Sequence, residues 1–244
     1  MSDLEAKWKK IQTIQDFAFI LSLDSVTMEV KGKMRDILKA AQLGEPAPNL
    51  ELVDLTTKTK LHLLSLAKAG RPFVVNFGSG SWPPFMANLG KFGSLRKNFS
   101  QVADFVTIYI AEAHPADRGH FKTGEDGGQF GQIDTATHKS LQDRIGAALK
   151  LKEKAASFLE GCPIMVSRFF FTVSLKNLLQ VDPMDDRANN AFAALPERIY
   201  VILDGKIVYE GGLGPFDYKI EEVEAFLAKR KWSILFRRKT KKKW

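Results

Sequence analysis

Residues 72–99 read PFVVNFGSGSWPPFMANLGKFGSLRKNF and contain the signals of a strand, a loop and a helix in direct succession. The apolar run Pro72–Phe77 is typical of a parallel strand that is buried on both faces. The small residues within Gly78–Trp82 predict a loop. Pro83 suits the first turn of a helix, where its missing N–H is not needed, and apolar residues then recur at helical spacing as far as Phe99.

Further elements follow this unit along the chain. The long segment 115–137 is rich in Gly, Asp and Thr and is predicted to be a loop. Asp204-Gly205 between two apolar runs predicts a hairpin. Strands are predicted at Val106–Ile110, Pro163–Val166, Arg198–Leu203 and Ile207–Tyr209, and helices at His138–Leu159 and Lys219–Lys229. The order β-α-β-(loop)-α-β-β-α predicts an α/β, thioredoxin-like fold, with a central mixed sheet flanked by helices.

Such a fold indicates where a reactive group would lie. It follows the first central strand, at the N-terminus of the next helix, where the helix dipole and free N–H groups stabilise a chalcogenide anion. In this chain the segment at that position is Ser79–Trp82. The one cysteine, Cys162, excludes an intramolecular disulfide, a CxxC redox pair and a cysteine-built zinc site. No His/Cys/Asp spacing predicts a metal site.

The net charge of +8 belongs to the C-terminal segment. Residues 229–244 hold nine Lys/Arg and no acid, whereas residues 1–228 hold 27 basic and 28 acidic residues. A basic body that could follow a nucleic acid is not indicated, so we expect no nucleic-acid partner. Two interpretations of the basic segment stay open: a solvated end without a partner, or a peripheral membrane contact in which apolar residues such as Trp232 and Phe236 stand beside the cations.

The N-terminal region carries no recognisable targeting signal. Its longest apolar stretch, Phe17–Leu23, is far shorter than the roughly 20 residues that a membrane span needs, and no signal-peptide cleavage site follows it. We therefore expect an intracellular protein, either cytoplasmic or peripherally bound to a membrane. We divide the chain into an N-terminal helical segment at 1–43, a thioredoxin-like domain at 44–228 and a basic C-terminal tail at 229–244.

Five segments in one collinear order resemble the iodothyronine deiodinase family. The segment NFGSGSWPPFMANLGKF resembles the family's active-site segment, in which selenocysteine occupies the position of Trp82. The other four are IYIAEAHPAD, THKSLQDRIGAA, GCPIMV and LPERIYVILDGKIVYEGGLGPFDY. The resemblance implies a thioredoxin-like fold with a deiodinase-type insertion loop. It also implies reductive removal of iodide from a small iodinated aromatic, an external thiol reductant with no bound cofactor, and a homodimer.

The resemblance further implies roles for individual residues around position 82. His114, with Glu112 two residues earlier on the same face of an extended segment, would handle protons near the iodine-bearing ring. His138 would contact the hormone or relay protons. Ser81 and Tyr109 would belong to the same proton network.

Two further candidates lie elsewhere in the sequence. Arg198 is a candidate clamp for a substrate carboxylate or phenolate, and its alternative interpretation is a structural ion pair with Glu197 or Asp204. Cys162 is a candidate for regenerating the enzyme, and its alternative interpretation is a buried core cysteine.

Trp82 is the main departure from the family pattern, because an indole cannot attack iodine. Either the protein is a catalytically inactive relative that binds an iodinated or phenolic aromatic, or Trp82 is a misread UGA codon for selenocysteine, which we favour. A peroxiredoxin-like thiol peroxidase is a third hypothesis that the GEPAPN segment permits. It leaves the EAHP and HKSLQDR motifs unexplained, and the chain has no peroxidatic cysteine.

Residues 166–180, VSRFFFTVSLKNLLQ, interrupt the resemblance. Their removal joins GCPIM to VDPMDDRANNAF, and the 15-residue length keeps the reading frame. Their codons can supply splice signals and a pyrimidine tract, so we interpret the segment as a retained intron. The alternative is a genuine apolar insertion.

Overall fold

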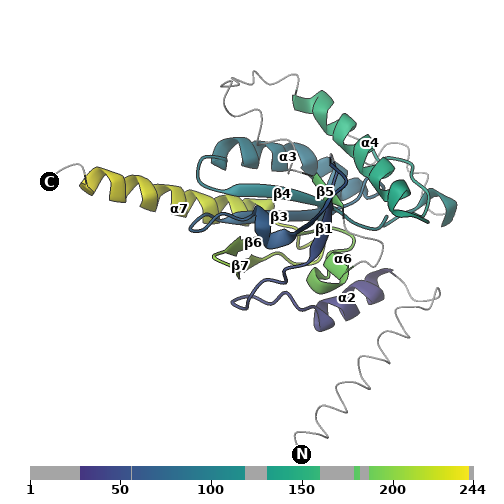
Figure 1. The fold of residues 1–244 in the computed structure, drawn as a ribbon, viewed down its shortest axis with the longest axis horizontal. Coiled ribbons are helices and arrows are strands. Elements are labelled where there is room, and N and C mark those ends of the chain that lie inside the picture. The colour runs from purple at the N-terminus through teal and green to yellow at the C-terminus, as the bar shows by residue number, and fades with distance from the viewer. Residues whose placement is uncertain (1–27, 56, 119–130, 160–178, 182–186, 242–244) are drawn as a thin grey trace, which may run out of the picture.

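The computed structural model describes residues 28–55, 57–118, 131–159, 179–181 and 187–241 of the chain. Within these residues the core is a seven-stranded mixed sheet (Figure 1). The parallel pairs β3–β4 and β4–β5 form its centre, and the remaining neighbours are antiparallel. The strand order is β2-β1-β5-β4-β3-β6-β7, formed by β1 (Glu51–Asp54), β2 (Lys60–His62), β3 (Phe73–Gly78), β4 (Asp104–Tyr109), β5 (Leu179–Val181), β6 (Arg198–Leu203) and β7 (Lys206–Glu210).

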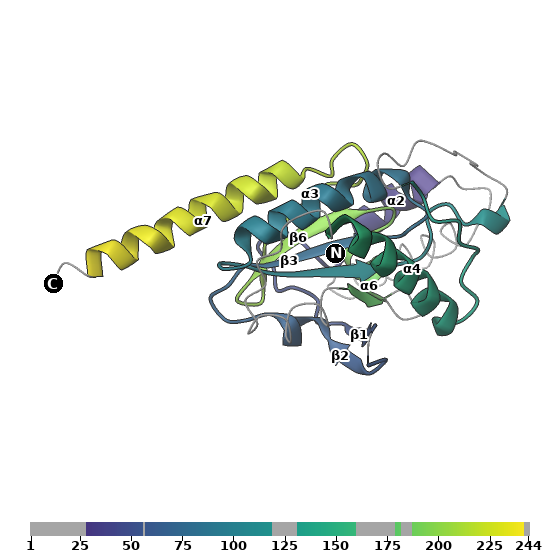
Figure 2. The same cartoon turned by 90° about the horizontal axis from the view of Figure 1, so that it is seen from above.

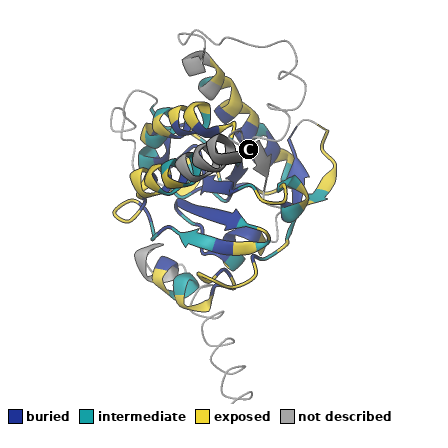
Figure 3. Ribbon diagram, turned by 90° about the vertical axis from the view of Figure 1, so that its left-hand side faces the viewer, coloured by how far each residue is buried: buried dark blue, intermediate teal, exposed yellow. Residues whose placement is uncertain are grey.

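Helices cover both faces of the sheet (Figure 2). One face carries α3 (Pro83–Phe99), α4 (Leu141–Leu159) and α7 (Ile220–Lys241), and the other carries α2 (Met28–Leu38) and α6 (Arg187–Phe192). Alternate residues of one strand serve the two faces: Val74 packs toward α3 and α7, whereas Val75 packs toward α6. The strands are therefore buried between the helices, whose outer sides are exposed (Figure 3).

This architecture confirms the predicted thioredoxin-like α/β fold and most of its elements, with two corrected boundaries. The helix predicted at His138–Leu159 begins at Leu141 instead, which leaves His138 in the loop before the helix. The helix predicted at Lys219–Lys229 begins at Ile220 and continues to Lys241, so the basic segment is helical for most of its length.

Three other predictions fall partly or wholly outside the described residues. The strand predicted at Pro163–Val166 lies outside them, and the strand beside β4 is formed by Leu179–Val181, whose first two residues belong to segment 166–180. Within 1–43, α2 is the described helix. No helix in the described part of the chain is long and apolar enough to cross a membrane.

Candidate active site

The turn between β3 and α3 places position 82 at the N-terminal cap of the helix. Trp82 N–H donates to the Ser79 carbonyl at 3.3 Å, and the Trp82 carbonyl accepts from Met86 N–H at 3.1 Å. A Cβ atom at Gly78 would lie 2.2 Å from Cδ2 of Phe85. Glycine at the end of β3 therefore lets the first turn of α3 approach the strand closely.

A buried hydrogen-bond network surrounds this turn and centres on the Glu112 carboxylate. One carboxylate oxygen accepts from Ser81 N–H at 3.0 Å, and the other accepts from the Tyr109 hydroxyl. The Tyr109 hydroxyl in turn accepts from Gly80 N–H at 3.0 Å. Nε2 of His138 lies 3.1 Å from the Glu112 oxygen that Tyr109 contacts. The structure thus brings Ser81, Tyr109, Glu112 and His138 together around the turn, with the imidazole of His138 beside the Glu112 carboxylate.

The protonation states of this network follow from burial and from the hydrogen bonds. Burial raises the pKa of Glu112, but hydrogen bonds from His138, Ser81 and Tyr109 outweigh it and leave the pKa below its usual value. Burial, together with the neighbouring Glu112 carboxylate, raises the pKa of Tyr109 well above its usual value. At neutral pH the site therefore contains a carboxylate that accepts from a neutral phenol.

Arg144, which the sequence interpretation did not select, orients the imidazole of His138. Arg144 Nε donates to Nδ1 of His138 at 3.2 Å, and both side chains are buried. Because Nδ1 accepts, the ring proton of neutral His138 is on Nε2, the nitrogen that lies 3.1 Å from a Glu112 oxygen. A helix that began at His138 would not predict this contact. The contact forms because α4 begins at Leu141, three residues after His138.

A side-chain cap determines where α4 begins. Asp143 Oδ2 accepts from the backbone N–H groups of Lys139 and Ser140, both at 2.9 Å, and Ser140 Oγ accepts from Asp143 N–H at 3.2 Å. These bonds resemble a capping box, which satisfies N–H groups that have no partner inside the helix.

Asp143→Ala is expected to lower the free energy of unfolding by about 1 kcal/mol, because it removes this cap. Urea denaturation followed by circular dichroism measures the change. Glu153→Ala, on an exposed part of the same helix, is the matched control and should change stability much less. Equal effects of the two substitutions would contradict the capping role.

The segment that carries His114 is bonded to the turn through its backbone. His114 N–H donates to Ser81 Oγ at 3.1 Å, and Ala113 N–H donates to Ser79 Oγ at 3.3 Å. The His114 ring lies 5.1 Å from the Trp82 ring, centroid to centroid, and is half-buried. His114 is therefore adjacent to position 82, as the sequence predicts.

The described ends of loop 115–137 pass beside the same turn. Ile133 N–H donates to the Gly80 carbonyl at 2.8 Å, and Ala116 N–H donates to the Thr135 carbonyl at 2.9 Å. Ile133 also belongs to the apolar cluster that contains Trp82. The base of the loop thus contributes an apolar wall to the site.

Glu197 is a site residue that the sequence interpretation assigned only to a structural ion pair. Its side chain is fully buried, and Oε1 accepts from Trp82 Nε1 at 3.1 Å. Burial raises the Glu197 pKa to about 7, although hydrogen bonds from Trp82 and Asn88 oppose the shift. A Cβ at Gly214 would lie 2.3 Å from Glu197 Cγ, so glycine there leaves room for this side chain.

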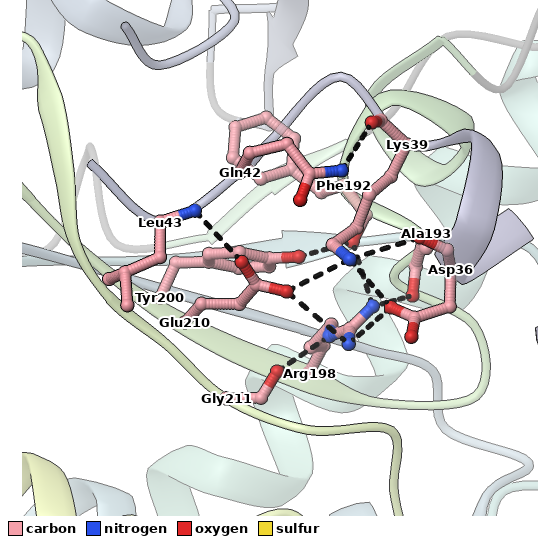
Figure 4. Close-up of polar contacts among 10 residues, drawn as sticks. All are labelled: Asp36, Lys39, Gln42, Leu43, Phe192, Ala193, Arg198, Tyr200, Glu210 and Gly211. Atoms are coloured by element: carbon pink, nitrogen blue, oxygen red, sulfur yellow. Dashed lines mark hydrogen bonds and ion pairs between the residues drawn. The ribbon is translucent and has the colours of Figure 1, made fainter. Parts of the chain in front are cut away.

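Arg198, the predicted substrate clamp, lies apart from this site, on the face of the sheet that carries α2 and α6. Figure 4 shows its polar contacts. Its guanidinium donates to the carbonyls of Gly211 and Ala193 at 2.7 and 3.2 Å and pairs with Asp36 of α2 at 2.6 Å. Lys39 bridges Asp36 and Glu210, both at 2.9 Å. The geometry matches the structural alternative, with Asp36 as the ion-pair partner rather than Glu197 or Asp204.

This partly buried charge cluster holds α2 against the β6–β7 hairpin. Burial raises the pKa of Asp36, but bonds from Lys39 and Arg198 outweigh it and leave the pKa below its usual value. Leu43 N–H also donates to the Glu210 carboxylate at 3.0 Å.

Two remaining predictions concern redox regeneration and metal binding. Cys162 lies outside the described residues, so its predicted redox role stays a prediction. Among the side chains that the structure describes, no group of three or more His, Cys, Asp or Glu residues could hold a metal ion.

Comparisons with known proteins relate this geometry to one family. A family model described as "Iodothyronine deiodinase" matches residues 4–231. The chain is 36% identical over 214 residues to a thyroxine 5-deiodinase from Gallus gallus, covering 88% of this chain and 73% of that protein. It is 38% identical over 191 residues to a type I iodothyronine deiodinase from Xenopus laevis, covering 78% and 65%. A solved thioredoxin domain of a thiol-disulfide oxidoreductase from Bacteroides vulgatus is 15% identical with a TM-score of 0.43, covering 76% and 98%.

Proposed function

The chain belongs to the iodothyronine deiodinase family of oxidoreductases, and from this premise we propose that its site removes iodide reductively from an iodothyronine when position 82 carries a selenol or thiol. The main support is the position of residue 82, which caps α3 beside a buried carboxylate network. Pro83 and Pro84 contribute no N–H, so the positive end of the α3 dipole would stabilise a chalcogenide anion there. We include an external thiol as reductant and a homodimer in this proposal.

The proposed reaction balances with two thiols as the reductant. The chalcogenide at position 82 attacks the iodine, a chalcogen–iodine bond forms, and the carbon–iodine bond breaks with its electron pair left on the aryl carbon. That carbon takes up a proton. One thiol then displaces iodide from the chalcogen, and a second thiol releases the reduced enzyme and a disulfide. Overall, the aryl iodide and two thiols become the aryl hydrogen product, iodide, a proton and a disulfide.

The residues around the turn are suited to move the proton. Nε2 of His138 lies 3.1 Å from the Glu112 carboxylate, which accepts from Tyr109, so a proton can be exchanged between these neighbouring groups. His114 lies on the exposed side of position 82, where an aromatic substrate would approach. We assign His114 to substrate contact and the buried network to proton supply.

A second function is favoured by one observation on Trp82 itself. The indole is almost fully buried and donates its N–H to Glu197, so tryptophan is accommodated at this position with its own polar group hydrogen-bonded. A protein that keeps Trp82 would bind an iodinated or phenolic aromatic without turnover, because an indole offers no nucleophile for iodine.

Iodide release by the Trp82→Cys variant tests the proposal. With thyroxine and an excess of dithiothreitol, we expect release at least roughly tenfold above that of the unchanged chain, because a thiolate at a helix N-terminus is a competent nucleophile. Trp82→Ser is the matched control, since it opens the same space without a chalcogen that can attack iodine. A further Cys162→Ser change shows whether Cys162 contributes to regeneration.

The outcomes separate the hypotheses. Iodide release by the cysteine variant alone supports the deiodinase site. Thyroxine binding by equilibrium dialysis with no release from any variant supports the binding function and overturns the catalytic proposal. Consumption of hydrogen peroxide in place of iodide release would favour the thiol peroxidase hypothesis.

A further inference from the structure

Helix α7 leaves the body of the protein halfway along its length. Its first turns are anchored by buried residues such as Val223 and Leu227. Arg230 donates to the Gly70 carbonyl at 3.1 Å, and Lys231 donates to the Asn98 carbonyl at 3.3 Å. The helix continues to Lys241, ten residues or about 15 Å beyond Lys231. Figures 1 and 2 both show this part extending away from the sheet and the other helices.

The sequence of this projecting part differs sharply from that of the body. Residues 232–241 contain four Lys/Arg and no acid, whereas residues 1–228 are close to neutral. Within residues 232–241 stand two aromatic and two aliphatic residues, Trp232, Ile234, Leu235 and Phe236. These residues belong to α7 itself, so a helix that is anchored to the domain holds them, and they do not form a separate tail.

This combination favours an anionic lipid surface over a nucleic acid. Contacts with nucleic-acid phosphates need cations and gain nothing from an apolar cluster that includes Ile234 and Leu235. Helices that lie in the membrane interface combine Lys and Arg with Trp, Phe and Leu, since the apolar residues enter the boundary between headgroups and acyl chains. Residues 1–228 hold 27 basic and 28 acidic residues, so they add no excess of cations that would favour a nucleic acid.

We propose that the projecting part of α7, residues 232–241, is a peripheral membrane anchor that binds the anionic headgroups of a lipid bilayer. The cations supply the attraction to the surface, and the aromatic residues supply shallow insertion. This inference is independent of the chemistry at position 82.

Vesicle co-sedimentation of the full chain tests the proposal. We expect binding to vesicles of phosphatidylcholine with 30% phosphatidylserine, weak binding to pure phosphatidylcholine, and release as salt rises. Arg237→Gln/Arg238→Gln should lower the partition coefficient about 25-fold, since each cation contributes roughly a factor of five. Lys150→Gln/Lys152→Gln is the matched control, because it removes two exposed cations from α4 and should leave binding unchanged.

A second variant separates insertion from simple charge attraction. Trp232→Ser/Phe236→Ser keeps every cation and should weaken binding while the salt dependence remains. The proposal is overturned if the chain does not bind the anionic vesicles, or if the α4 control weakens binding as much as the α7 variant. It is also overturned if a DNA duplex binds the chain more tightly than the anionic vesicles at equal salt.

Discussion

Replacing Glu112 by alanine is expected to lower the free energy of unfolding by about 3–5 kcal/mol, the range for removing one partner of a buried charged contact. The loss would be large because Ser81 N–H and the Tyr109 hydroxyl are both buried and both use this carboxylate as their acceptor. Without Glu112 the two donors stay buried but lose this acceptor, so the free-energy cost of removing them from water is no longer offset. Urea denaturation followed by circular dichroism measures the effect.

The acid limb of the stability profile, which is the fall in the free energy of unfolding as the pH decreases, gives a second measurement of the same interaction. Because the folded pKa of Glu112 is below its unfolded value, its stabilisation is fully present above about pH 4.5 and is lost as the pH falls through the folded pKa. Glu112→Gln should therefore flatten the acid limb as well as lower stability at neutral pH. Glu153→Gln, at an exposed position of α4, is the control, and an unchanged acid limb in Glu112→Gln would contradict the assignment.

Glu197→Gln, in contrast to the Glu112 substitutions, is expected to raise the free energy of unfolding at basic pH. The folded pKa of Glu197 is about 7 against a usual value of 4.5, so the folded state binds a proton more tightly than the unfolded state. Stability from this group is then present below pH 4.5 and falls as the pH rises through 7. At pH 8 glutamine should stabilise the protein on the order of 3 kcal/mol, since each pKa unit corresponds to about 1.4 kcal/mol.

The shape of the pH profile identifies the cause of this effect. Glutamine keeps an oxygen to accept from Trp82 Nε1, so the hydrogen bond is preserved while the ionisation is removed. Urea denaturation between pH 5 and pH 8 should show the two proteins converging at the acid end and separating at the basic end. A constant difference across this range would show that packing, and not ionisation of Glu197, determines the change.

The β3–α3 unit could be predicted from the sequence because its signals are local. An apolar run, a small-residue loop and Pro83 at the first helical position each report on neighbouring backbone. Ser81, Tyr109, Glu112 and His114 were selected from the resemblance to the family, and in the structure they lie on or shortly after the two central parallel strands. The carboxyl ends of such strands meet at one edge of the sheet.

The roles of Glu197 and Arg198 could not be separated in the same way. Adjacent residues at the start of a strand point to opposite faces, but a strand buried on both faces carries no sequence signal that distinguishes them. In the structure Glu197 faces Trp82 and Arg198 faces Asp36. The distant partner, Asp36 on α2, decides which of the two belongs to the site.

The start of α4 also could not be predicted from the periodicity of the apolar residues. The apolar spacing of the helix is compatible with a start at His138, and the cap at Asp143 decides otherwise. That shift of three residues allows Arg144 to contact the His138 ring.

Helix α3 keeps position 82 far enough from the cations of α7 that salt screens the electrostatic interaction between them. Its 17 residues span about 25 Å between position 82 and the Asn98–Lys231 contact where α7 leaves the body. At physiological ionic strength charges are screened over about 8 Å. The acidity of a selenol or thiol at position 82 should therefore be insensitive to the cations of α7, and the two ends of the molecule can change independently in evolution.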